Sequence, residues 1–269
     1  MFTNLLHETK AWLRHVVCAR GPHGVHSPFV YQLITSVLRS KQRSELYGAI
    51  ERERSRLRRS REVIEVVDFG VGSRVQRGAI RSVSTIAKTA LQPSTHACAI
   101  ARLAIQSKVT SILELGTSFG VTTAHLAAAM PHAKVFTIEG SASVAKIAGG
   151  VWNNLGLNEI DVTISDFQSV LFTLLKRMQT VDLVIVDGDH RGDACLSYID
   201  TILPFTHENT VIVIDDIYWS PSMTQAWEKC SRDSRFSLSL DFFDFGVLYQ
   251  TKGRVKEHFR LRRPWVSIG

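Results

Sequence analysis

Short apolar runs alternate with amphipathic stretches throughout the second half of the chain. Apolar and β-branched residues dominate each run, and apolar positions at helical spacing fill the intervals. This alternation is typical of a mostly parallel sheet with helices on both faces. The run at 181–187 is the most apolar, which predicts a central strand buried on both sides. The runs that predict parallel strands are residues 111–115, 134–140, 159–165, 181–187 and 210–216.

The two ends of the chain depart from that alternation. Near the C-terminus, runs at 236–240 and 244–250 are joined by a short connection, which predicts an antiparallel hairpin. At the N-terminus, apolar positions at helical spacing over residues 1–19 predict a helix. A second helix is expected to begin at Ser27 and Pro28, because serine caps a helix N-terminus and proline fits its first position.

The region between these helices and the first parallel strand is rich in charge and glycine. Mixed charges at helical spacing over 51–62 predict an exposed helix with an excess of arginine. We interpret 63–80 as a short strand followed by a mobile segment, a candidate lid. Pro93 separates this region from the alternating part. We therefore expect a basic, mainly helical extension over residues 1–92 and an α/β domain over residues 93–269.

The composition is that of a globular protein. The chain has 269 residues, of which 45% are hydrophobic, so it can bury a full core. Its four cysteines form no CxxC pair, which argues against a disulfide framework or a zinc knuckle and fits a reducing cytoplasm. No apolar run approaches the roughly 18 residues of a membrane-spanning helix, and charges interrupt the N-terminal helix too early for a signal peptide. We expect a cytoplasmic protein without a transmembrane segment.

Positive charge is concentrated at the two ends of the chain. Residues 1–95 hold 16 Lys and Arg against 7 Asp and Glu, hence +9, whereas residues 96–269 hold 16 against 18, hence −2. This asymmetry indicates either an anionic partner, such as nucleic acid, or simply a solvated surface. A second basic cluster lies near the C-terminus and consists of Lys252, Arg254, Lys256, Arg260, Arg262 and Arg263.

The strand at 111–115 leads into a glycine-rich turn, ELGTSFG, which a helical run follows. Gly116 and Gly120 let the backbone turn sharply and let a ligand approach it closely. The first amides of the following helix point towards that ligand. The next strand ends in Glu139, about 20 residues beyond the turn, where a dinucleotide-type fold places the carboxylate that binds ribose hydroxyls. The turn lacks the GxGxxG spacing that suits a pyrophosphate.

Several motifs resemble those of class I S-adenosylmethionine (AdoMet)-dependent methyltransferases. The ELGTSFG turn and Glu139 resemble motif I and the acidic strand end that follows it. The VDGDH run at 186–190 and the DD pair at 215–216 are similar to those of the O-methyltransferase-like branch. The segments GPHGVHSPFVY, DDIYWS and KEHF resemble a group of bacterial methyltransferases typical of Bacteroidetes, which implies no particular substrate. The fold implied is an α/β, Rossmann-like, doubly wound sheet of seven strands, mostly parallel with an antiparallel last strand.

The resemblance implies AdoMet as the cofactor, a ligand with an adenosine but no phosphate. Glu139 would bind the ribose hydroxyls. Asp166, at the carboxyl end of its strand, would accept a hydrogen bond from the adenine amino group. Phe167 would either pack on the adenine ring or belong to the core. The cofactor-binding residues expected on this basis are Glu114, Gly116, Thr117, Ser118, Gly120, Thr122, Glu139, Gly140, Ser165, Asp166, Phe167 and Asp187.

Methyl transfer requires a donor and an acceptor aligned about 3 Å apart. His190 is the first candidate for the base that takes the proton of an acceptor hydroxyl, and Asp187 is expected to orient the sulfonium or the acceptor. Relatives of the catechol O-methyltransferase type hold a metal with three oxygen ligands from these strand ends, the last usually Asn. The matching residues are Asp187, Asp215 and Asp216, which would suit Mg²⁺ or Ca²⁺. The Asp in place of Asn departs from that pattern, and without a metal the pair at 215–216 would cap the next helix.

These features together predict an AdoMet-dependent methyltransferase that acts on the hydroxyl group of a small molecule. Two alternatives stay open. The basic N-terminal region would suit an RNA methyltransferase, although the sequence contains no recognisable RNA-binding module and no NPPY-type segment. The chain would otherwise bind AdoMet without catalysis. His23 and His26, in a loop near the N-terminus, are expected either to cover the active site or to act in catalysis.

Overall fold

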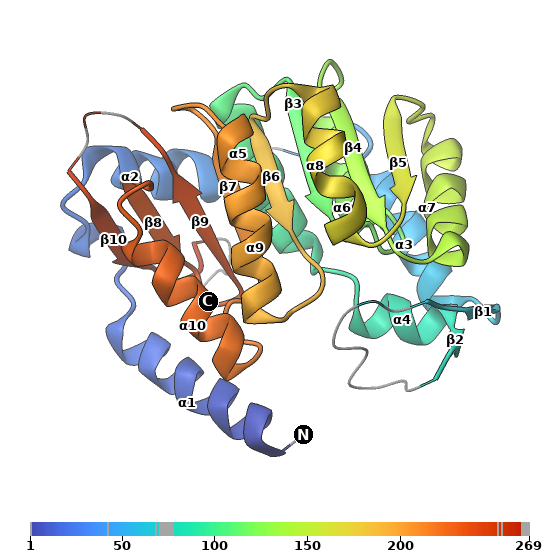
Figure 1. The fold of residues 1–269 in the computed structure, drawn as a ribbon, viewed down its shortest axis with the longest axis horizontal. Helices are drawn as coiled ribbons and strands as arrows, with labels where there is room; N and C mark the ends of the chain where they lie inside the picture. The colour runs from blue at the N-terminus through green and yellow to red at the C-terminus, as the bar shows by residue number, and fades with distance from the viewer. Residues whose placement is uncertain are drawn as a thin grey trace.

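The computed structural model describes residues 2–41, 43–67, 69, 78–251, 253 and 255–264. Its centre is an eight-stranded sheet with the order β10-β8-β9-β7-β6-β3-β4-β5, covered by helices on both faces (Figure 1). All strands of this sheet run parallel except β9, which is antiparallel to β7 and β8. The strands are β3 (Ser111–Leu115), β4 (Lys134–Glu139), β5 (Ile160–Ile164), β6 (Leu183–Val186), β7 (Val211–Asp215), β8 (Leu238–Asp241), β9 (Phe245–Tyr249) and β10 (Glu257–Arg260).

The sheet is doubly wound. From β3 the chain moves outward to β4 and β5, and then returns to β6, which pairs with the other side of β3. The carboxyl ends of β3 and β6 therefore form the topological switch point, where open α/β sheets bind their ligands. α8, α9 and α10 cover one face and α5 and α6 the other. The helices of this part are α5 (Ser94–Ser107), α6 (Val121–Ala129), α7 (Ala142–Leu155), α8 (Phe167–Met178), α9 (Gly192–Ile202), η3 (Leu203–Phe205) and α10 (Pro221–Arg232).

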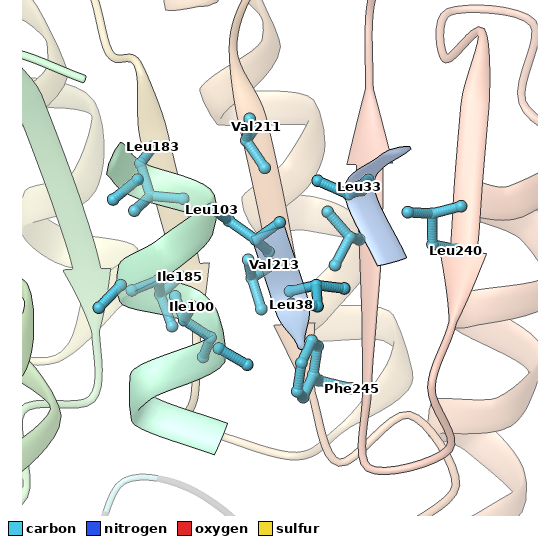
Figure 2. Close-up of a cluster of buried hydrophobic side chains, with 14 of the residues drawn as sticks. Leu33, Leu38, Ile100, Leu103, Leu183, Ile185, Val211, Val213, Leu240 and Phe245 are labelled. Atoms are coloured by element: carbon cyan, nitrogen blue, oxygen red, sulfur yellow. The ribbon is translucent and has the colours of Figure 1, made fainter. Parts of the chain in front are cut away.

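The N-terminal region packs onto this body. Leu33 and Leu38 are fully buried against Ile100 and Leu103 of α5 and against Val213 of β7 (Figure 2). Because burying one leucine stabilises a fold by roughly 1.5–3 kcal/mol, this contact joins the region firmly to the sheet. The boundary at residue 93 stays a prediction. The elements of this region are α1 (Phe2–Cys18), η1 (Pro22–Gly24), α2 (Pro28–Gln32), the π-helical turn η2 (Leu33–Leu38), α3 (Tyr47–Arg59), β1 (Val63–Glu65), β2 (Ile80–Ser82) and α4 (Val83–Thr89).

The expected α/β fold is confirmed, with one strand more than the sequence predicts. β8 and β9 form the expected antiparallel hairpin, and β1 is the expected short strand. The additional strand is β10, which pairs in parallel with β8 at the edge of the sheet. The last strand is therefore parallel, and the antiparallel one, β9, lies inside the sheet. The mobile part of the 63–80 segment falls mainly on residues 68 and 70–77, which lie outside the described residues. Within the described chain, no helix is both long enough and apolar enough to cross a membrane.

Candidate functional site

A cavity of about 400 Å³ lies at the switch point of the sheet. The loops that follow four neighbouring parallel strands contribute to its wall, because the carboxyl ends of parallel strands meet at one edge. The residues from these loops are Gly116 and Ser118 after β3, Glu139 and Gly140 at the end of β4, Ser165, Asp166 and Phe167 after β5, and Asp187, Gly188 and Asp189 after β6. Eight of the twelve expected cofactor-binding residues are among them.

The turn after β3 needs glycine at two positions for different reasons. Gly116 has φ 103°, and a Cβ added there would lie 2.0 Å from the backbone oxygen of Asp187. A side chain at this position would therefore force β3 and β6 apart at the cavity. Gly120 has φ 68°, and an added Cβ would meet the indole of Trp152, whose Nε1–H donates to the Gly120 oxygen at 2.8 Å. The second glycine thus accommodates a core tryptophan.

Glu139 lies at the edge of the turn and lines the cavity. Its Oε2 accepts a hydrogen bond from the backbone N–H of Ser118 at 2.9 Å, and its Oε1 accepts one from the N–H of Ser141 at 3.0 Å. Ser118 itself has φ 49°, a left-handed conformation that costs on the order of 1 kcal/mol for a residue other than glycine. The strained turn therefore orients its amide towards the carboxylate and holds it at the cavity.

Glu114 and Thr117 lie beneath the turn and do not line the cavity. The Glu114 carboxyl accepts hydrogen bonds from Thr123 at 2.6 Å and Thr137 at 2.8 Å, and the Thr137 hydroxyl also contacts that of Thr117 at 2.6 Å. Burial raises the pKa of Glu114 to about 8, so the buried side chain is mostly protonated at neutral pH. These residues support the turn from below, and Thr122 is likewise buried, in α6.

Asp166 and Phe167 begin α8 at the far end of the cavity. Asp166 caps the helix, and its Oδ1 accepts from the Ser169 N–H at 2.9 Å, a hydrogen bond that lowers the pKa of Asp166. The Phe167 ring meets the Tyr198 ring edge-on, with centroids 5.6 Å apart, and both rings line the cavity. Phe167 therefore combines packing on α9 with exposure to the cavity, where the sequence left a choice between the two.

The strand ends of β6 and β7 carry three carboxylates that act electrostatically on one another, those of Asp187, Asp215 and Asp216. Burial and the neighbouring charge of Asp216 raise the pKa of Asp187 to about 6, and burial together with Asp187 raises the pKa of Asp215. Asp187 and Asp215 interact with each other, so the titration of each acid depends on the other. In the part of the chain that the structure describes, no three His, Cys, Asp or Glu side chains are grouped to hold a metal ion. The observed arrangement does not fit the expected Mg²⁺ or Ca²⁺, and no step below uses a metal.

His190 stands beside these acids and is not among the residues that line the cavity. Its Nε2 lies 3.7 Å from Oδ2 of Asp216, and its ring centroid lies 5.6 Å from that of Trp219. It also acts electrostatically on Asp187, whose pKa it lowers. The structure therefore places the expected base within one group of side chains with the expected orienting acid.

Residues 113–217 match the model of a family described as a methyltransferase domain. This segment is a methyltransferase domain. It contains the turn after β3, the acid at the end of β4 and the strand ends of β6 and β7. No curated protein matches the sequence of the chain.

Solved structures share the fold of the methyltransferase domain. The O-methyltransferase TomG from Streptomyces achromogenes, in complex with SAM, is 20% identical, covering 61% of this chain and 82% of that chain with a TM-score of 0.53. An O-methyltransferase from Bacillus cereus, in complex with SAH, is 19% identical, covering 60% and 83% with a TM-score of 0.52. The SAH-bound methyltransferase PaMTH1 from Podospora anserina is 14% identical, covering 85% and 98% with a TM-score of 0.59. At these identities the likeness concerns the fold.

The methyltransferase domain also brings residues to the cavity that the sequence analysis does not assign. Asp189 accepts hydrogen bonds from Arg191 at 2.7 and 2.8 Å and from the Tyr198 hydroxyl at 2.7 Å. All three side chains line the cavity. Asp189 and Arg191 lie in or next to the VDGDH run, so their position in the sequence gives a local signal, whereas Tyr198 has none.

A second unassigned wall comes from the N-terminal region. Val66, Val67, Phe69 and Arg81, which flank the part of the 63–80 segment outside the described residues, line the cavity of the methyltransferase domain. A Cβ added to Gly140 would lie 2.7 Å from the Phe69 ring, so this ring lies directly on the turn after β4. The position of these residues agrees with the expectation that this segment covers the site, although its action as a lid stays a prediction.

Proposed function

We propose that this protein is an AdoMet-dependent methyltransferase that methylates a hydroxyl group of a small molecule in the cytoplasm. The observation that carries the proposal is the position of Glu139. Two backbone N–H groups hold its carboxylate at the cavity, immediately beside the turn at Gly116. A carboxylate in this place suits the two ribose hydroxyls of an adenosine, while the glycine lets the remainder of the ligand approach the backbone.

The charge of the cavity favours a cationic ligand without phosphate groups. Carboxylates outnumber guanidinium groups in its wall, and Arg191 is already paired with Asp189. A sulfonium would be attracted to this environment, whereas a pyrophosphate would be repelled. The charged residues of the wall are Glu139, Asp166, Asp187 and Asp189 against Arg81 and Arg191.

In the proposed reaction, AdoMet would supply a methyl group bonded to a sulfonium. The acceptor oxygen would form the new bond to the methyl carbon as the carbon–sulfur bond breaks, its electron pair would stay on sulfur, and S-adenosylhomocysteine would be the second product. The proton of the acceptor hydroxyl passes to the imidazole of His190. Asp216, whose Oδ2 lies 3.7 Å from Nε2 of His190, stabilises the imidazolium that forms. Asp187 interacts electrostatically with both residues and also lines the cavity.

Calorimetry with AdoMet and S-adenosylhomocysteine tests the cofactor site. Glu139→Gln keeps the shape of the side chain but removes the charge that would bind the ribose. We expect its affinity for both compounds to fall roughly tenfold or more, the effect of losing hydrogen bonds to a charged group. Glu159→Gln, at an exposed position outside the cavity, is the matched control. Equal affinities in the two variants would contradict the assignment of the cavity.

The acceptor class is tested with labelled AdoMet in a cell extract that is afterwards separated into small molecules, RNA and protein. Label in the small-molecule fraction supports the proposal. Label in the RNA fraction would support the RNA methyltransferase alternative, and no transfer into any fraction would support an AdoMet-binding protein without catalysis. The Glu139→Gln variant is assayed beside the unaltered protein at subsaturating AdoMet, where its weaker cofactor binding should reduce the label.

A further inference from the structure

A second cavity lies apart from the one at the switch point. Its volume is about 900 Å³, and it shares no lining residue with the first cavity. Its wall comes from the loop at 20–23, the segment at 39–43 after η2, the first turns of α5, and the residues after β10. The N-terminal loop and the C-terminal residues are bound directly, since Arg20 N–H donates to the Arg260 oxygen at 2.9 Å and Arg262 N–H donates to the Arg20 oxygen at 3.0 Å.

This wall is strongly basic. Among the described residues that line it there are seven Lys and Arg side chains and no Asp or Glu. The excess of positive charge that the sequence places at both ends of the chain therefore partly converges in one concave place. The cationic residues are Arg20, Arg39, Lys41, Arg43, Arg102, Arg262 and Arg263.

Most of these cations have no carboxylate partner within the described chain. Arg20 and Arg262 donate to the backbone oxygens of Gly24 and Ala19, which carry no net charge. Arg43 stacks over the ring of Tyr47, with its guanidinium carbon 4.1 Å from the ring centroid. Arg263, in contrast, pairs with Asp244, which is not among the residues that line the cavity.

Gathering like charges in this way raises the free energy of the empty cavity. Arg102 is buried, and both its burial and the charge of Arg43 lower its pKa, so the two guanidinium groups repel each other. An anion between them would relieve the repulsion, and guanidinium groups bind phosphate and carboxylate oxygens in pairs. A single negative charge would leave most of the cations uncompensated, so the complementary ligand carries at least two.

The shape of the wall favours a small ligand over a nucleic acid strand. The cations line one cavity of the size that small molecules occupy. Proteins that bind single strands also stack the bases on aromatic rings. No Phe, Tyr or Trp is among the described residues of this wall.

We propose that this basic cavity is a second binding site, for a small multivalent anion such as an organic diphosphate. The site is independent of the AdoMet cavity, so it is tested separately from the proposed function. The ligand needs a compact group of two or more negative charges, which a phosphate compound or a polycarboxylate can provide. Pyrophosphate and citrate serve as probes for these two sources.

The test is calorimetry with each probe at physiological ionic strength, using the full chain. Arg39→Ala/Lys41→Ala removes two exposed cations from the wall, neither of which has a carboxylate partner in the described residues. Arg58→Ala/Arg59→Ala removes the same charge from the exposed side of α3, outside the cavity. We expect affinity for at least one probe to fall roughly tenfold or more in the first variant and to stay unchanged in the second.

Three outcomes would overturn the proposal. Absence of binding by the unaltered protein would refute it, and equal losses in the two double variants would show general attraction of anions to a basic surface. Tighter binding of a single-stranded oligoribonucleotide than of either probe, with the same loss in the first variant, would show a nucleic acid site instead. Tighter binding of pyrophosphate assigns a phosphate compound, and tighter binding of citrate a polycarboxylate. AdoMet affinity, measured in the same variants, is expected to stay unchanged and reports that the fold is intact.

Discussion

His15 of α1 lies against Asp241 of β8, with its Nδ1 3.3 Å from the carboxylate, although the two residues belong to opposite ends of the chain. Asp241 is completely buried and also accepts hydrogen bonds from the Tyr218 hydroxyl at 2.6 Å and from Nε of Arg260 at 3.0 Å. Nε2 of His15 bonds to the Leu261 oxygen at 3.1 Å. One buried acid therefore connects the first helix, the edge strand β10 and the loop after β7.

We expect Asp241→Asn to lower the free energy of unfolding by about 3–5 kcal/mol, because it leaves Arg260 without its buried counter-charge. Burial alone would raise the pKa of Asp241, but the neighbouring His15 and the hydrogen bond from the Tyr218 hydroxyl hold it at about 2, below its ordinary value. The stabilisation is therefore fully present above about pH 4 and is lost as the pH falls towards 2. Urea denaturation across this range checks both effects. Asp161→Asn, which breaks an exposed pair with Arg177, should cost less than about 1 kcal/mol.

Gly116→Ala should destabilise the protein and abolish AdoMet binding. The added Cβ would lie 2.0 Å from the backbone oxygen of Asp187, directly after β6, and φ at Gly116 is 103°, so both this contact and the turn must distort. Gly150→Ala is the control, since it lies within α7 with open space around an added Cβ, and should be neutral or slightly stabilising. Thermal unfolding and calorimetry measure the two effects. Normal cofactor affinity in Gly116→Ala would mean that the ligand lies elsewhere.

Glu114→Gln should change how stability depends on pH. Burial raises the pKa of Glu114 to about 8, whereas the unfolded chain has the ordinary value near 4.3. The folded state therefore holds a proton that the unfolded state has released, and the free energy of unfolding falls as the pH rises from about 4 to about 8. The glutamine variant has no such proton, so its stability relative to the unaltered protein should increase over this range. If the difference in the free energy of unfolding between the two proteins were the same at every pH, Glu114 would not be protonated in the folded state.

His190→Gln should slow methyl transfer by roughly 10²–10⁴-fold, the usual contribution of a positioned base. AdoMet affinity should stay unchanged, because His190 is not among the residues that line the cavity. His132→Gln, at an exposed position after α6, is the control. Single-turnover rates with saturating AdoMet separate chemistry from binding. A normal rate in His190→Gln would remove this residue from the mechanism, and weaker AdoMet binding would give it a role at the cofactor instead.

Local spacing in the sequence is enough to bring Gly116, Glu139, Asp166 and Asp187 into one cavity. Each residue follows a strand that its apolar run identifies, and the carboxyl ends of parallel strands meet at one edge of a doubly wound sheet. The alternation of runs and helices likewise predicts the fold, since the period of apolar positions reports which face of each element is buried. For these features, neighbours along the chain carry all the information required.

Local spacing does not reveal what a residue contacts once the chain has folded. Glu114, Thr117 and Gly120 belong to the same motif as Gly116, yet they serve the core beneath the turn. The strand at Glu257–Arg260 is only four residues long, and no pattern of apolar residues predicts it. It forms because it pairs with β8. Such assignments depend on packing against partners that are remote in sequence.

Only the tertiary structure shows that the N-terminal region contributes to the walls of both cavities. Val66 and Phe69 line the cavity of the methyltransferase domain, and Arg20, Arg102 and Arg262 line the basic cavity. The sequence determined that positive charge gathers at both ends of the chain, but not where those residues lie relative to one another in space. Only the contact between those ends turns scattered arginines into one concave surface, because electrostatic repulsion and attraction depend on the distance between charges in space.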